Sequence, residues 1–324
     1  MITKIRTLET EGGRKMVIDV HYHLLVEDWL PEAWWDAISQ VYVNALKAMG
    51  MEMTTEDVKA NIIGGFWDPE GDKLVAQMDE SGIDKTVILP QDFGLAMGEP
   101  KVSIEEQNKA YAEVQKKHPD RIIAFAGVDP RRPGAAELME QAINEWGLKG
   151  IKLHPGSGYF PDEGEVYKFF EKISNLNVPV LIHSGIFFGI SKTCDPIHFD
   201  NILLNFPNLT IIAAHLGRGW QNVLFEMGAH RPNLSTDFSG WQMVSQQHYP
   251  IFCQNLRFAL TAFGPERVLF GTDGPFYIPA MPSKDFLQLI RDLPQNAPEG
   301  ITFSAEEIDA MLGESAAKIL GLSN

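Results

Sequence analysis

Short apolar runs alternate with segments of helical periodicity along most of the chain. Runs rich in Val, Ile, Leu and Phe, each expected to form a strand, occupy residues 16–23, 85–90, 121–128, 149–155, 178–185, 209–217, 233–238 and 267–274. Most of them lack the alternation of polar and apolar residues typical of a strand with one wet face, so strands buried on both faces are predicted. Segments between them, such as DKLVAQMDESGI and EEQNKAYAEVQKKHP, have the apolar spacing of amphipathic helices.

This alternation predicts an α/β fold and favours a parallel (β/α)8 barrel of the TIM type. A doubly wound open sheet would alternate in the same way, but its glycine-rich phosphate loop is missing after the first run, where HYHL stands instead. A length of 324 residues suits one barrel of about 250 residues with insertions, although two smaller domains would also fit it. We therefore predict a single barrel domain over residues 1–324.

Two stretches depart from the repeating strand-and-helix unit. Residues 24–72 form a helical, aromatic-rich insertion after the first run. Barrel enzymes keep their sites at the C-terminal ends of the strands, so this insertion is expected to lie over that mouth as a lid. Its large aromatic side chains are expected mainly to pack against one another, with one or two reaching the substrate. Residues 302–322 are expected to form a closing pair of helices, which begins with a capping box of Ser304 and Glu307.

Composition narrows the classes of partner. A formal net charge of −16 argues against nucleic acid and anionic membranes, because both bind basic faces. The N-terminus lacks the apolar core of a signal peptide, and no stretch approaches the roughly 20 apolar residues of a membrane span. A cytoplasmic protein that acts on a small molecule is therefore expected, and a homodimer is left open. Cys194 and Cys253 form no CxxC pair, which predicts neither a disulfide framework nor a thiolate metal site.

Ionisable residues stand at the ends of several expected strands. His21 and His23 are two residues apart at the end of the first run, so both side chains point to the same side, which in a barrel is the interior. His183, His215 and Asp273 end the fifth, sixth and eighth runs. Taken singly, each is more often a hydrogen-bonded structural residue. Together they would bury several polar groups at one mouth, which a shared divalent metal would satisfy.

The motifs IDVHYH, KGIKLHP, PVLIHSG, AAHLG and FGPERVLFGTDGPF resemble the strand motifs of the amidohydrolase-related proteins called amidohydrolase family 2. The resemblance runs from about residue 16 to the C-terminus. It implies a barrel with one divalent metal ion, for which Zn²⁺ is expected. Carried over by motif, the metal ligands would be His21, His23, His183 and Asp273. His215 would hold or activate the metal-bound water.

The chemistry of these side chains agrees with that plan. Neutral imidazoles and one carboxylate suit zinc and leave a position for water, whose pKa falls to about 7 on the metal. Asp273 is expected to accept the proton of this water, and His215 to polarise a substrate carbonyl, so both are predicted to be catalytic. Asp19, two residues before His21, is expected either to support the metal ligands or to form a hydrogen bond deeper in the strand.

Three further residues are predicted to contact the substrate. His154 would touch it directly, while Lys152 and Arg218 would bind an anionic group. Lys152 also has an alternative role, since a carboxylated lysine on this strand could bridge two metal ions and recruit His183 and His215 to the second.

Three classes of function are consistent with the sequence. The main prediction is a hydrolase that uses metal-activated water on an amide, ester or lactone of a small organic acid. The alternative is a nonoxidative carboxy-lyase acting on an aromatic or dienoic acid, because the resembling family includes decarboxylases similar to aminocarboxymuconate semialdehyde decarboxylase. A catalytically silent metal-binding barrel is the third. The sequence does not choose between the first two, since both need the same metal site.

Overall fold

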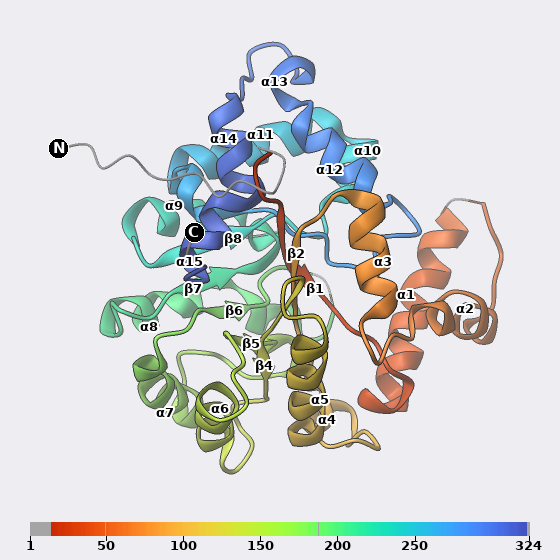
Figure 1. Ribbon diagram of the computed structural model, residues 1–324, viewed down its shortest axis with the longest axis vertical. Helices are drawn as coiled ribbons and strands as arrows, with labels where there is room; N and C mark the ends of the chain where they lie inside the picture. The colour runs from red at the N-terminus through yellow and green to blue at the C-terminus, as the bar shows by residue number, and fades with distance from the viewer. Residues whose placement is uncertain (1–13, 49, 187, 323–324) are drawn as a thin grey trace.

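The computed structural model describes residues 14–48, 50–186 and 188–322, and the N-terminal segment examined for a signal peptide lies almost wholly outside them. Strands occupy the centre, and helices surround them (Figure 1). The strands are β1 (Ile18–Tyr22), β2 (Lys85–Ile88), β3 (Ile122–Ala124), β4 (Ala126–Gly127), β5 (Ile151–Leu153), β6 (Val180–Ile182), β7 (Ile211–Ala213), β8 (Leu234–Asp237) and β9 (Val268–Leu269). Each predicted run contains at least one of them.

The strands form a closed parallel barrel, which confirms the predicted fold. Parallel pairing joins β1, β2 and β3 in one sheet. It joins the six strands from β4 through β9, each to the next in chain order, in another. β3 and β4 are two parts of one predicted run, separated at Phe125, whose N–H donates to Ile88 O at 3.1 Å. The ring closes where Val20 N–H donates to Phe270 O at 2.9 Å and Asp273 N–H donates to His21 O at 2.8 Å. Asp273 is thereby placed beside His21.

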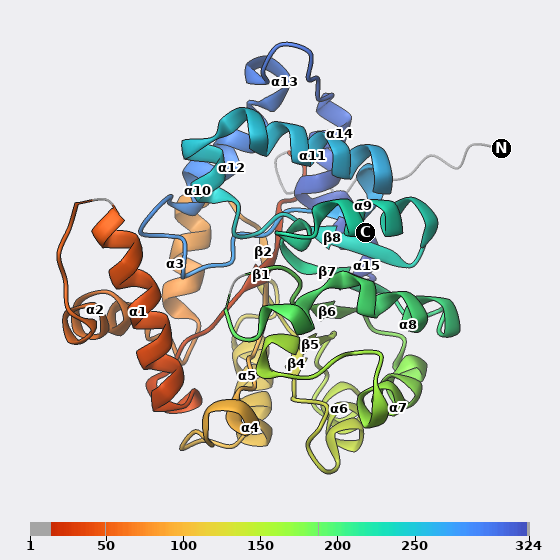
Figure 2. The same cartoon turned by 180° about the vertical axis from the view of Figure 1, so that it is seen from behind.

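Helices cover the outside of the barrel (Figures 1 and 2). They are α3 (Asp72–Ser81), α4 (Gly94–Met97), α5 (Ile104–Lys117), α6 (Ala135–Asn144), α7 (Gly164–Ile173), α8 (Asp200–Asn205), α9 (Gln221–His230), α10 (Gln242–Gln247), α11 (Tyr249–Phe263), α12 (Ser283–Arg291) and α13 (Leu293–Asn296). α5 begins at a capping box of Ser103 and Glu106. No helix in the described part of the chain is long and apolar enough to cross a membrane.

The core lies on both sides of the strands. One buried cluster joins strands on opposite sides of the ring through residues such as Val87, Leu181 and Leu269, so it fills the barrel interior. A larger cluster lies between the strands and the helices and includes Ile151 and Leu153 of β5. Lys152, between these two residues, therefore points into the barrel.

The C-terminal segment is one continuous helical run, which corrects the expected pair of helices. It consists of α14 (Ala305–Asp309), a π-helical turn (Ala310–Glu314) and α15 (Ser315–Ile319). The predicted capping box of Ser304 and Glu307 is present. The π-helical turn changes the hydrogen bonding inside the run, and the carbonyl of Met311 there accepts the Phe270 N–H at 3.0 Å. The run is thus bonded to the barrel instead of folding back on itself.

The insertion after β1 carries α1 (Glu32–Ala48) and α2 (Thr55–Asn61), which lie together at one side of the barrel (Figure 2). Its aromatic side chains pack against one another: the ring centroids of Trp34 and Trp35, and of Trp35 and Trp67, are each 4.8 Å apart. Trp34 also contacts Phe276, which follows β9, at a centroid distance of 6.1 Å. The insertion is therefore packed against the end of the barrel where Asp273 lies.

Candidate active site

A cavity of about 250 Å³ opens at the C-terminal ends of the strands. Its volume lies just below the usual range of small-molecule pockets, which is about 300–1,000 Å³. Its lining includes most of the ionisable residues that the sequence singled out, namely His23, His154, His183, His215 and Asp273. α1 contributes Trp34, Ile38, Tyr42 and Ala45 to the same cavity. Polar groups therefore gather at an otherwise apolar pocket.

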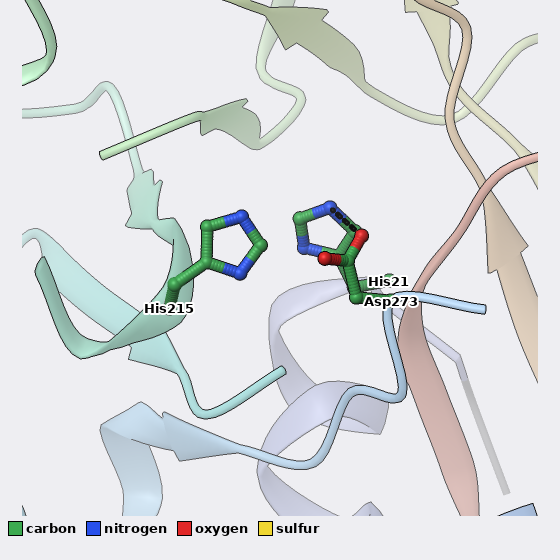
Figure 3. A group of neighbouring side chains, drawn as sticks. All are labelled: His21, His215 and Asp273. Carbon is green, nitrogen blue, oxygen red and sulfur yellow. Dashed lines mark ion pairs between the residues drawn. The ribbon is translucent and has the colours of Figure 1, made fainter. Parts of the chain in front are cut away.

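His21, His23 and Asp273 form a compact group. Asp273 Oδ1 lies 3.6 Å from His21 Nε2 and 3.4 Å from His23 Nε2. Figure 3 shows His215 facing the same centre, and one ligand atom from each of His21, His215 and Asp273 lies within 4.8 Å of the others. All these side chains are buried. Nitrogen and carboxylate oxygen donors thus converge from three strand ends.

The hydrogen bonds of the two N-terminal histidines fix their tautomers. His23 Nδ1 is 2.8 Å from Leu89 O, which can only accept, so Nδ1 carries the proton. His21 Nδ1 is 3.0 Å from the Asp237 carboxylate and is protonated for the same reason. Burial lowers the pKa of both His21 and His23, which favours neutral rings. Each Nε2 then directs a lone pair towards Asp273, an arrangement that a bound divalent cation would stabilise.

His215 and Asp273 both have a backbone conformation that residues other than glycine rarely adopt. Their φ angles are 64° and 52°. Such conformations cost roughly 1–3 kcal/mol and persist where neighbouring contacts hold them. Asp237 Oδ1 accepts the His215 N–H at 3.1 Å, and the Trp241 indole N–H donates to His215 O at 2.8 Å. The fold thus holds two strained residues at the cavity, as is common at functional sites.

Asp237, at the end of β8, was not identified from the sequence. Its Oδ2 binds His21 Nδ1, and its Oδ1 accepts the N–H groups of His215 and Ser239, the latter at 3.0 Å. Burial would raise the pKa of Asp237, but its interactions with His21, His215 and Ser239 outweigh that effect, and the pKa lies below its usual range. One carboxylate therefore orients both His21 and His215. Its position at a strand end, like that of Asp273, was the available signal.

Replacing Asp237 by asparagine is expected to weaken metal binding about 10- to 100-fold, because His21 loses the partner that fixes its tautomer and ring orientation. Competition with a chelator would measure this affinity. Thr236→Val is the matched control, since it removes a hydroxyl from the preceding residue of β8 that donates to Ala213 O at 2.7 Å. An Asp237→Asn protein with unchanged metal affinity would contradict the positioning role.

The residues predicted to bind substrate lie in three different settings. His154 lines the cavity and stacks on His183, with ring centroids 4.0 Å apart and planes 10° from parallel. Lys152 is buried within the barrel, its Nζ lies 3.3 Å from His21 Nε2, and burial lowers its pKa to about 8. Arg218 donates to Gly240 O at 3.1 Å. Neither Lys152 nor Arg218 is among the described residues that line the cavity.

His183 and His215 interact directly, since His215 Nε2 is 3.2 Å from His183 Nδ1. His215 Nδ1 is 3.1 Å from Ser239 O and so carries a proton, which leaves Nε2 to accept from His183 Nδ1–H. With this tautomer, His183 Nε2 bears a lone pair, as it does in His21 and His23. Both nitrogens of His215 are then used within the protein.

Asp19 is bonded inside the barrel, close to the metal-ligand candidates. Its Oδ1 accepts the His21 N–H at 3.0 Å and the Thr272 N–H at 2.9 Å. It thereby ties β1 to the segment that carries Asp273. Of its two predicted roles, Asp19 supports the metal-ligand candidates through hydrogen bonds to the backbone that carries them.

Comparison with known proteins places the chain in a wider group. The model of the family described as amidohydrolase matches residues 18–322. A 2-amino-3-carboxymuconate-6-semialdehyde decarboxylase of Dictyostelium discoideum is 23% identical, over 95% of this chain and 92% of its own length. A gamma-resorcylate decarboxylase of Rhizobium sp. strain MTP-10005 is 24% identical, over 69% of this chain and 84% of its own length.

A solved structure shares the fold. The 5-carboxyvanillate decarboxylase of Novosphingobium aromaticivorans, complexed with manganese and 4-hydroxy-3-methoxy-5-nitrobenzoic acid, superposes with a TM-score of 0.64 at 18% identity. The match covers 95% of this chain and 96% of that one.

Proposed function

This chain belongs to the amidohydrolase family, and from that premise we propose that it is a metal-dependent nonoxidative decarboxylase of a small aromatic acid. Besides a 2-keto-4-carboxy-3-hexenedioate hydratase, the enzymes to which it is similar include decarboxylases of 2-amino-3-carboxymuconate-6-semialdehyde and of gamma-resorcylate. They support the carboxy-lyase alternative better than the hydrolase that the sequence analysis put first.

The observation that carries the proposal is the donor group of His21, His23 and Asp273 at the inner end of an apolar, aromatic-walled cavity. A flat acid can lie there with its carboxylate at the donor group and its ring against Trp34 and Phe276. Loss of carbon dioxide converts the charged carboxylate and one proton into uncharged products, so walls that exclude water favour the reaction.

We assign the metal to His21, His23, His183 and Asp273, with Zn²⁺ as the first candidate and Mn²⁺ as the second. Imidazole nitrogens and one carboxylate suit either ion. The hydrogen bond that we infer from His183 Nδ1–H to His215 Nε2 supports His183 as the fourth ligand. When bound, the ion would supply positive charge that fixes and polarises the oxygen atoms of the acid.

The remaining steps fall to side chains of the chain. The carbon that bears the carboxylate gains one proton, the bond to the carboxyl carbon breaks with its electron pair retained by the ring, and carbon dioxide leaves. One proton is consumed for each molecule of carbon dioxide released. Asp273 faces the cavity and would hold and transfer this proton, while His215 would stabilise the charge that develops on a substrate oxygen by donating from Nε2 in place of its contact with His183.

The surroundings of the site also have proposed roles. The insertion of residues 24–72 would close over the substrate and exclude water, since α1 lines the cavity beside Asp273. His154 would contact the ring. Lys152 would act on the site from inside the barrel, through its contact with His21. Arg218 would stabilise the backbone at the barrel mouth through its bond to Gly240 O, instead of binding an anionic group. We propose a single domain in the cytoplasm, where the buried thiols of Cys194 and Cys253 would stay reduced.

The test is a substrate screen of the metal-loaded protein. Hydroxybenzoates, lactones and N-acyl compounds would be incubated with it, and carbon dioxide and product would be measured together. Release of carbon dioxide from a hydroxybenzoate, abolished by a chelator and restored by Zn²⁺ or Mn²⁺, is expected. Turnover of lactones or N-acyl compounds without carbon dioxide would refute the proposal and restore the hydrolase.

A further inference from the structure

The cavity continues beyond the histidines along one face of α1. Ile38, Tyr42 and Ala45 line it together with Val41, at the three- and four-residue spacing that places side chains on one side of a helix. From Ile38 to Ala45 this stripe extends roughly 10 Å along the helix axis. The stripe therefore offers more apolar wall than a carboxylate bound at the donor group would cover.

Exposure increases along this wall. Trp34, at the N-terminal end of α1, is 1% exposed, whereas Val41 and Met51 are 50% and 44% exposed although both line the cavity. Large apolar side chains therefore line the pocket up to its contact with solvent. An exposed apolar lining is unfavourable in water unless a ligand covers it.

The opposite wall has the same character. Phe276, Pro279 and Ala280, from the segment after β9, face α1 across the cavity. The hydroxyl of Tyr42 donates to Phe276 O at 2.6 Å, which ties α1 to this segment and limits how far the walls can separate. None of the described residues that line the cavity is a lysine or an arginine. A second anionic group of the substrate would meet no lysine or arginine in the described lining beside α1, and burying it there would be costly.

We propose that the natural substrate is an aromatic monocarboxylic acid with an apolar substituent, such as an alkyl chain or a second ring. The inference rests on the proposed decarboxylase function and adds the class of acid. The carboxylate lies at the donor group, and the substituent runs along α1 between Ala45 and Phe276 towards the mouth. Ala45 is the specificity-determining residue, because its small side chain leaves room at the C-terminal end of the stripe.

The experiment compares 2-hydroxybenzoate with its 4-alkyl derivatives and with a dicarboxylic analogue, using kcat/KM of the metal-loaded enzyme. We expect about a 4-fold gain for each methylene buried, which follows from the transfer free energy of a methylene group. Ala45→Phe should reduce the ratio of alkylated to unsubstituted substrate at least about 10-fold. Asn44→Phe, which adds the same ring at the neighbouring exposed position, should leave that ratio unchanged.

A second measurement separates this inference from the proposed function. Binding of phenol and of 3-alkylphenols to the same protein, followed by calorimetry, does not require turnover. Tighter binding with chain length, lost in Ala45→Phe, would support the inference even if no acid releases carbon dioxide. Decarboxylation without a preference for the alkyl chain, or with a preference for the dicarboxylic acid, would overturn it while leaving the decarboxylase proposal in place.

Discussion

Replacing His21 by alanine is expected to remove most of the bound metal and to lower kcat about 10³-fold or more. The imidazole Nε2 of His21 lies 3.6 Å from Asp273 Oδ1, and its Nδ1 is fixed by Asp237, so it is a pre-oriented donor. A shell with one donor missing binds its ion weakly and positions the substrate poorly. Metal content per chain after dialysis and kcat with saturating substrate would both be measured.

His230→Ala is the matched control for this variant, because it also removes an imidazole, and His230 is exposed at the end of α9 and is not among the described residues that line the cavity. That protein should keep one metal ion per chain and its activity. Full metal occupancy in His21→Ala would show that the assignment of this ligand is wrong. Close to two ions per chain in the unaltered protein would favour the two-metal alternative with a carboxylated Lys152.

His215→Asn should separate catalysis from metal binding. Asparagine tolerates the left-handed backbone conformation that His215 adopts at φ 64°, so the strand end should keep its shape. We expect the variant to retain the metal and to lose about 10²-fold in kcat, the usual scale for one acid, base or oxyanion-stabilising group. The readouts are metal content, kcat and the melting temperature.

The structure makes the opposite result equally informative. One ligand atom from His215 lies within 4.8 Å of those from His21 and Asp273, so a direct role as ligand is geometrically accessible. If His215→Asn lost the metal while its melting temperature with excess metal stayed normal, His215 would replace His183 in the shell. Decarboxylation would then need a different side chain to stabilise charge on the substrate.

The fold and the grouping of the site residues could be predicted because the fold follows from the spacing of apolar residues, and the grouping follows from the position of polar residues at the ends of the apolar runs. Strands buried on both faces read as apolar runs, and a polar residue at the end of such a run must lie at the barrel mouth. His21 and His23 share a face because they are two residues apart. The sequence therefore predicted which ends converge without any knowledge of distances.

What could not be predicted depends on how deep a side chain lies in the barrel and on how neighbouring strands are aligned. Lys152 has the parity of an inward-facing residue, but the sequence does not show that it lies against His21 instead of lining the cavity. Asp237 resembles any acidic residue at the end of a strand. Its role arises because β8 pairs with β7 so that its carboxylate reaches the His215 N–H and the His21 ring. The choice between hydrolysis and decarboxylation could not be made, since both use the same donors.

The most direct test of the proposed decarboxylation is the turnover of a hydroxybenzoate in D₂O, with product mass and carbon dioxide measured in one reaction. The product should have lost the carboxyl group and carry one deuterium at the carbon that bore it, with one carbon dioxide per molecule of acid. Product incubated alone in D₂O would correct for exchange without catalysis. A product that keeps its carboxyl group and has gained the elements of water would contradict the proposal.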